Sequence, residues 1–133
     1  MIKREYNEYL EKSLLEKVSG ITDIYQIIKT IIKERKITLV ELSEIIGVSR
    51  SKLIRGIKKV PCDKEIIIKT CLALNIEPMT QGFILFVSMV NIYTDSEEDR
   101  IYRYLLDELY KENYINIERK YKILKKKIKK VSV

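Results

Sequence analysis

Side chains able to bind an anion are concentrated in one short stretch near the middle of the chain. They are Arg50, Ser51, Lys52, Arg55, Lys58 and Lys59, and no acidic residue lies among them. A guanidinium group can donate two parallel hydrogen bonds to a guanine or a phosphate, and an ammonium group attracts a phosphate as a point charge. The chemistry that this stretch predicts is therefore the binding of a polyanion, without transfer of protons or electrons.

The composition gives no support to catalysis. The chain has no histidine, the side chain most often used for proton transfer near neutral pH. No glycine-rich phosphate loop, nucleophile elbow or metal constellation is present. The run Glu97, Glu98 and Asp99 is interpreted as the first turn of a helix, where acids complement the helix dipole. Cys62 and Cys71 would point to different helical faces, so we expect two reduced thiols, no enzyme, no metal and no cofactor.

The positive charge of the chain is unevenly distributed. Residues 1–117 contain 18 basic and 18 acidic residues, whereas residues 118–133 contain eight basic residues and one acid. The tail therefore carries the whole net charge of +7. Two basic regions, one in the middle of the chain and one at its end, are typical of a protein with a polyanionic partner.

The central basic stretch follows a pattern of two short helices joined by a glycine turn. Thr38 and Glu41 have the capping-box spacing that starts a helix, and Gly47 stands where the chain must turn sharply. Ser49 can cap a second helix from Arg50 to about Ile57. The apolar positions of the two helices are Val40, Leu42, Ile45 and Ile46, then Val48, Leu53 and Ile57. The basic side chains would then lie on the exposed side of the second helix.

Two helices joined by a tight turn of this kind form a helix-turn-helix. The chain resembles the phage-repressor family, the Cro-like or xenobiotic-response-element-like regulators, over about residues 24–78. The matching residues are Ile37, Thr38, Leu42, Ile45, the run Gly47 to Ser51, Leu53, Pro61 and the run Leu72 to Ile76. The resemblance implies an all-α fold with a helix-turn-helix core of about four to five helices, which binds duplex DNA as a homodimer.

The resemblance also assigns roles on the second motif helix, whose exposed side lies in the major groove in that family. Its base-contacting positions are occupied here by Arg50, Ser51 and Arg55. One bidentate pair between an arginine and a guanine is worth about 1–3 kcal/mol of discrimination. Contacts to phosphates, which anchor without specifying, are expected from Lys52, Lys58, Lys59 and, at the start of the first motif helix, Thr38.

Several positions depart from the family pattern. Leu39 stands where the family uses a glutamine on DNA, and Ser43 stands where it has a small alanine. Gly56 falls where a packed apolar residue is expected, and a glycine inside a helix is destabilising by about 1 kcal/mol relative to alanine. The second helix ends in the run Ile57 to Lys59 instead of Glu-Asn-Gly. These departures favour a second hypothesis, in which a degenerate helix-turn-helix is kept as a scaffold for binding a protein.

The remainder of the chain is also predicted to be helical. Around the helix-turn-helix core at 21–78, we expect an N-terminal amphipathic helix at 1–20, a helical extension at 79–112, and a basic C-terminal helix or tail at 113–133. The nearly apolar run 83–90 fits a buried strand or a buried helix. A helix from about Thr80 to Tyr93 is favoured because the chain offers no second strand-like run to pair with it.

A helix that is apolar on every side must be covered, either by the N-terminal helix or by a second copy of the protein. We therefore expect a homodimer. The residues expected in its interface are Phe83, Phe86, Val87 and Val90.

The basic tail leaves three interpretations open. Lysine and arginine occupy the faces that its apolar residues leave, and they include Arg119, Lys122, Lys126, Lys129 and Lys130. The tail can be a phosphate-binding arm, an amphipathic helix on an anionic membrane, or a solvated helix whose apolar side packs on the core or on a partner copy. The absence of Trp and Phe from the tail weakens the membrane interpretation.

The sequence therefore predicts a sequence-specific duplex-DNA-binding regulator of transcription, and the resemblance implies a repressor that serves a phage or another mobile element. The alternative is the protein-binding module, such as an antitoxin or an inhibitor of a host nucleoprotein complex. No run approaches the roughly 18 apolar residues of a membrane span, and the N-terminus does not resemble a signal peptide. We expect a cytoplasmic protein with no membrane partner.

Overall fold

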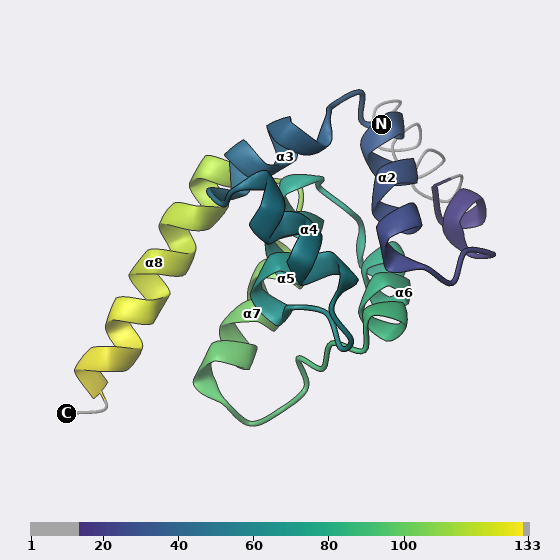
Figure 1. The fold of residues 1–133 in the computed structure, drawn as a ribbon. Coiled ribbons are helices and arrows are strands. Elements are labelled where there is room, and N and C mark those ends of the chain that lie inside the picture. The colour runs from purple at the N-terminus through teal and green to yellow at the C-terminus, as the bar shows by residue number, and fades with distance from the viewer. Residues whose placement is uncertain (1–13, 132–133) are drawn as a thin grey trace, which may run out of the picture.

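The computed structural model describes residues 14–131, and within them every regular element is a helix (Figure 1). The prediction of an all-α fold is confirmed for this part of the chain, and the run that fitted either a strand or a helix is helical up to Ser88. Of the expected N-terminal helix, residues 14–18 are helical and residues 1–13 lie outside the described part. No helix in the range 14–131 combines the length and the apolar character needed to cross a bilayer.

Helix α5 forms the centre of the molecule. The helices are α2 (Ile24–Glu34), α3 (Leu39–Ile46), α4 (Arg50–Lys58), α5 (Lys64–Ala73), α6 (Pro78–Ser88), α7 (Glu97–Glu108) and α8 (Tyr114–Val131). α5 contacts α3, α4, α6, α7 and α8, and it buries the residues Ile66, Ile67, Ile68, Thr70, Cys71 and Leu72. The positions of α3, α4, α6, α7 and α8 therefore depend on how they pack on α5, whereas α2 packs mainly on α4 and α6.

The helix starts follow local sequence. Asp23, Thr38, Ser49, Asp63 and Ser96 each accept a hydrogen bond from a backbone N–H in the first turn of the helix that follows. Each such cap is worth about 1 kcal/mol. These caps fix where α2, α3, α4, α5 and α7 begin.

Both thiols are free and buried. Cys62 donates its S–H to the carbonyl oxygen of Ile57, with an S···O distance of 3.0 Å, and leaves the capping of α5 to Asp63. Burial raises the pKa of Cys71 to about 12. Cys71 therefore belongs to the core and is not reactive.

The predicted extent of α6 is wrong at its end. The helix stops at Ser88 and not at Tyr93, because Met89 adopts a left-handed conformation (φ 59°) and closes the last turn with its N–H. The chain after it runs inward, and the side chain of Val90 is only 8% exposed. Val90 therefore packs inside its own chain and is removed from the predicted dimer surface.

Asp99 does more than complement a helix dipole. Its side chain is 2% exposed and accepts hydrogen bonds from Lys64 Nζ (2.8 Å) and from the Thr94 hydroxyl. Burial alone would raise the pKa of Asp99, but the hydrogen bonds from Lys64 and Thr94 hold it below its ordinary value. The pair ties the first turn of α7 to the first turn of α5.

Candidate nucleic-acid interface

Helix α4 is held on one side by α2, α3 and α5. Leu53 and Ile57 are fully buried on that side, and Gly56 lies between them against α5. A Cβ atom on Gly56 would lie 2.5 Å from Ile66 Cδ1 and 3.2 Å from Asp63 Cβ. The glycine that departs from the family pattern is therefore what allows α4 and α5 to approach this closely.

The turn into α4 is tightly bonded. Gly47 has a φ of 75°, a conformation that costs a glycine little, and its N–H and that of Val48 donate to carbonyl oxygens of the last turn of α3. Two residues later, the side chain of Ser49 accepts from the N–H of Lys52 at 3.1 Å. The predicted turn residues are confirmed, and together they fix the direction in which α4 leaves α3.

The opposite side of α4 is basic and open to solvent. Arg50, Ser51, Lys52, Arg55, Lys58 and Lys59 are all exposed. Within residues 14–131, no carboxylate forms an ion pair with any of the five cations among them. The guanidinium and ammonium groups therefore remain available to an external anion.

Helix α2 adds a contribution that the sequence interpretation missed. Lys58 Nζ lies 4.7 Å from the centre of the Tyr25 ring, and Lys29 Nζ lies 5.6 Å from the same centre. A cation over an aromatic face is stabilised by about 0.5–1 kcal/mol at an exposed site. The basic surface thus continues from α4 onto Lys29. The four-residue spacing of Tyr25 and Lys29 was visible in the sequence, but the approach of Lys58 was not.

Thr38 is less suited to a phosphate than predicted. Its hydroxyl accepts from the N–H of Glu41 at 3.1 Å, and Glu41 Oε1 accepts from the N–H of Thr38 at 3.2 Å. The capping box thus uses the donor of Thr38 and puts a carboxylate beside it. Of the residues predicted to contact phosphates, Thr38 has the least favourable electrostatic surroundings.

The remaining departures in α3 are accommodated by packing. Leu39, which departs from the pattern that the resemblance implies, is half-buried against the core, so its side chain packs on its own protein. Ser43 is buried, and its hydroxyl donates to the carbonyl oxygen of Val40 at 2.6 Å. The predicted apolar face of α3 is wrong at Val40 and Ile45, which remain 46% and 40% exposed, because the buried side of the helix runs through Leu42, Ser43 and Ile46.

The secondary basic region lies on another helix. Arg119, Lys122, Lys126 and Lys129 are exposed on α8, whereas the side chain of Lys130 lies outside the described part. α8 packs on α5 and α7, and α4 packs on α2, α3 and α5. The structure therefore places the two basic regions on separate helices that share the support of α5.

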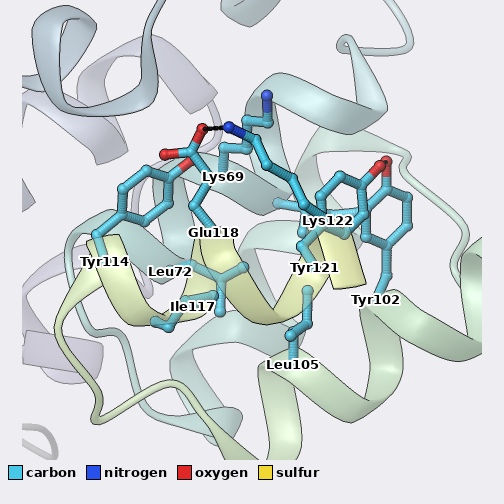
Figure 2. Close-up of a pocket in the computed structure, with 10 residues that line it drawn as sticks. Lys69, Leu72, Tyr102, Leu105, Tyr114, Ile117, Glu118, Tyr121 and Lys122 are labelled. Carbon is cyan, nitrogen blue, oxygen red and sulfur yellow. Dashed lines mark hydrogen bonds and ion pairs between the residues drawn. The ribbon is translucent and has the colours of Figure 1, made fainter. Parts of the chain in front are cut away.

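A small apolar pocket marks the seam between α8 and the body of the protein (Figure 2). It has a volume of about 70 Å³, with Leu72, Leu105 and Ile117 in its lining and the ion pair of Glu118 with Lys122 (3.3 Å) at its rim. Sites for drug-sized ligands are usually about 300 Å³ or more. Among the described residues, no group of three or more His, Cys, Asp or Glu side chains is arranged to hold a metal ion.

Comparisons of the chain with models of known protein families, with curated protein sequences and with solved structures found no match.

Proposed function

We propose that the protein binds duplex DNA through α4 and regulates transcription. In this proposal α3, the turn at Gly47 and α4 act as a helix-turn-helix, with α4 as the recognition helix. The observation that carries it is the exposed, acid-free basic side of a helix whose other side is fully packed. A rigid helix of this kind fits the major groove, which admits one α-helix.

The positions of the side chains suggest their roles. Ser51 and Arg55 lie four residues apart, on one exposed stripe of α4, and Arg50 lies in its first turn. These residues are proposed to contact base edges, because guanidinium groups can fork onto a guanine. Lysines attract phosphates as point charges, so the exposed lysines of α4 are proposed to contact the DNA backbone, and Lys29 joins them.

Repression is the proposed outcome of binding, by occupation of an operator in a phage or another mobile element. A homodimer is proposed to bind two half-sites about one helical turn apart. The surface proposed for dimerisation is the outer side of α6, where Phe86 is 82% exposed while Phe83 and Val87 are half-buried. A monomeric mass by light scattering at working concentration would remove the dimer from the proposal.

The test is duplex binding at two salt concentrations, followed by the double variant Arg50→Ala with Arg55→Ala. The wild type should lose affinity steeply with salt, with a log–log slope of about −0.9 per phosphate contact. The double variant should lose about 2–6 kcal/mol of preference for the operator, the worth of two bidentate pairs. A matched control is Lys17→Ala with Lys69→Ala, since these cations are already paired with Glu34 and Glu65. Unchanged operator preference in the arginine variant would overturn the assignment of α4.

The exposure of Val40 and Ile45 favours a second candidate function, the binding of a protein partner through α3. Two apolar side chains beside the basic helix are suited to a protein surface, whereas phosphates need none. This candidate predicts that the full chain shows no sequence preference among duplexes, because its cations attract phosphates without reading bases. A sequence preference that is lost in Arg50→Ala with Arg55→Ala would exclude it as the main function.

A further inference from the structure

Helix α8 carries a concentration of positive charge, most of which plays no part in packing the fold. Residues 118–133 carry the whole net charge of +7. The one acid among them, Glu118, pairs with Lys122 at 3.3 Å on an exposed surface, where an ion pair is worth about 1 kcal/mol or less. Within the described residues, Arg119, Lys126 and Lys129 form no ion pair with a carboxylate. Such an excess of exposed cations attracts anions from outside the protein.

The two sides of α8 differ sharply. Tyr114 and Ile117 are buried, and Tyr121, Leu124 and Ile128 pack against the core from the same side. Arg119, Lys122, Lys126 and Lys129 follow one another at spacings of three, four and three residues on the opposite side, and all are exposed. These four cations are called the α8 stripe below. The stripe lies on the side of α8 opposite its packed residues. The C-terminal part of the helix extends beyond the other helices (Figure 1).

The attachment of α8 is firm at its base. The Tyr121 ring stacks on the Tyr102 ring, with centroids 5.7 Å apart, and the Tyr102 hydroxyl donates to Glu98 at 2.6 Å. Lys125 Nζ lies 5.2 Å from the centre of the Tyr121 ring and 3.9 Å from Glu98 Oε2, so this lysine belongs to the attachment and not to the stripe. The stripe is therefore carried on a fixed helix.

The dimensions and the chemistry of the stripe fit a nucleic-acid backbone. At about 1.5 Å per residue, residues 119–129 span about 15 Å. Duplex DNA carries one charge per about 1.7 Å of its axis, so several phosphates lie within that length. Three of the four cations are lysines, which act as point charges and do not read bases. The contact should therefore be independent of sequence.

A membrane surface fits less well. A helix that lies on a bilayer inserts an exposed apolar face, usually with Trp or Phe. The apolar side of α8 is already packed on the body of its own chain, and the helix contains neither Trp nor Phe. The side that remains carries the cations and two exposed isoleucines, Ile115 (65%) and Ile123 (44%), without the Trp or Phe that usually inserts into a bilayer.

We propose that α8 is a second DNA contact, an arm whose stripe binds the phosphate backbone of duplex DNA without reading sequence. The choice of duplex DNA as the polyanion rests on the proposed function of α4. The arm adds affinity, and α4 adds sequence preference.

The test compares two triple variants of the full chain that lose the same charge. The first is Lys122→Gln, Lys126→Gln and Lys129→Gln, and the control is Lys17→Gln, Lys69→Gln and Lys111→Gln. Binding to a fluorescent duplex of random sequence is measured at two salt concentrations that differ fourfold. Removing three phosphate contacts should reduce the log–log slope by about 2.7, so the wild type should lose about 40-fold more affinity than the stripe variant between the two salts.

The control should keep the wild-type slope, and so should a triple lysine-to-arginine variant of the stripe. Equal losses in the stripe variant and the control would mean that net charge alone matters, and this would overturn the proposal. A wild-type slope in the stripe variant would overturn it too. Binding to vesicles of equal parts phosphatidylserine and phosphatidylcholine is measured in a parallel experiment. Vesicle binding that depends on the stripe, with duplex binding that does not, would assign α8 to membranes instead.

The two proposals can fail separately. If the stripe variant loses slope while Arg50→Ala with Arg55→Ala keeps the operator preference, the arm stands and the role of α4 falls. If the arginine variant loses the preference while the stripe variant binds as the wild type does, the arm falls and α4 stands.

Discussion

Helices α4 and α8 are both basic, but they differ in length, packing and charge. α4 has nine residues, is capped by Ser49, and buries Leu53, Gly56 and Ile57 among three other helices. α8 has 18 residues, packs by one side on α5 and α7, and carries many more cations. α4 is short and closely fitted, and α8 is long and strongly charged.

The contrast between the close packing of α4 and the high charge of α8 corresponds to two different requirements for binding DNA, sequence specificity and affinity. Reading a base edge requires a side chain held within about 0.5 Å of its working position, which a tightly packed helix provides. Attracting a phosphate requires only that a flexible lysine be near it. We therefore expect α4 to be sensitive to small changes in its packing and α8 to be sensitive to changes in its charge.

The largest effect on stability is expected from Gly56→Val, which would disrupt the close packing of α4 against α5. The added carbons would meet Ile66 and Asp63, and the free energy of unfolding should fall by about 3 kcal/mol, since overpacking a tight site costs this much. Urea denaturation measures it. Gly82→Val is the matched control, because a Cβ at Gly82 meets nothing within 4 Å, and its effect should stay within about 0.5 kcal/mol. Equal effects at the two glycines would contradict the close fit of α4 on α5.

The next largest effect is expected from Asp99→Asn. This change removes the ion pair between Asp99 of α7 and Lys64 of α5, and α8 packs on both of these helices. Lys64 would lose its buried partner, and the free energy of unfolding should fall by about 2 kcal/mol. Asp107→Asn, on the exposed side of the same helix, should change it by less than about 0.5 kcal/mol. An Asp99→Asn protein as stable as the wild type would show that the ion pair contributes nothing.

The pH dependence of stability provides a second test of the Lys64–Asp99 ion pair. The pKa of Asp99 in the folded protein is below its ordinary value of 3.8, so the folded state binds a proton less readily than the unfolded state. The contribution of the ion pair is therefore fully present above about pH 3.8 and is lost as the pH falls through the lower, folded pKa. The difference in melting temperature between the wild type and Asp99→Asn should be constant at neutral pH and should narrow in acid. A difference that widens in acid would contradict the assigned direction.

The smallest effect is expected from Tyr121→Leu at the base of α8. The variant loses the stack on Tyr102, and an aromatic pair is worth about 1 kcal/mol beyond its buried area. The melting temperature should fall slightly, and duplex affinity should fall without any change in sequence preference. Tyr104→Leu, an exposed tyrosine on α7, is the control and should leave both quantities unchanged. A change in sequence preference in Tyr121→Leu would contradict the division between the two helices.

The features that the sequence predicted well depend on neighbours along the chain. The capping box at Thr38, the left-handed Gly47 and the cap at Ser49 involve residues within a few positions of one another. Hydrophobic spacing likewise identified Leu53 and Ile57 as the buried side of α4. Local geometry and periodicity are enough for such features.

The features that the sequence did not predict depend on contacts between distant segments. From the sequence, Gly56 is expected only to destabilise its helix. In the structure it leaves the space that Ile66 of the next helix occupies. The partner of Asp99 is 35 positions away, and the approach of Lys58 to Tyr25 joins two helices. Nothing local predicted these pairs, because they exist only once the helices have packed.

Selection of bound sequences from a random duplex library distinguishes arginines of α4 that read bases from arginines that only attract phosphates. The wild type and the double variant Arg50→Ala with Arg55→Ala would be carried through the same selection. The account predicts that the wild type enriches a defined sequence and that the double variant enriches none, although it still binds DNA through its remaining cations. Enrichment of the same sequence by both proteins would contradict the account.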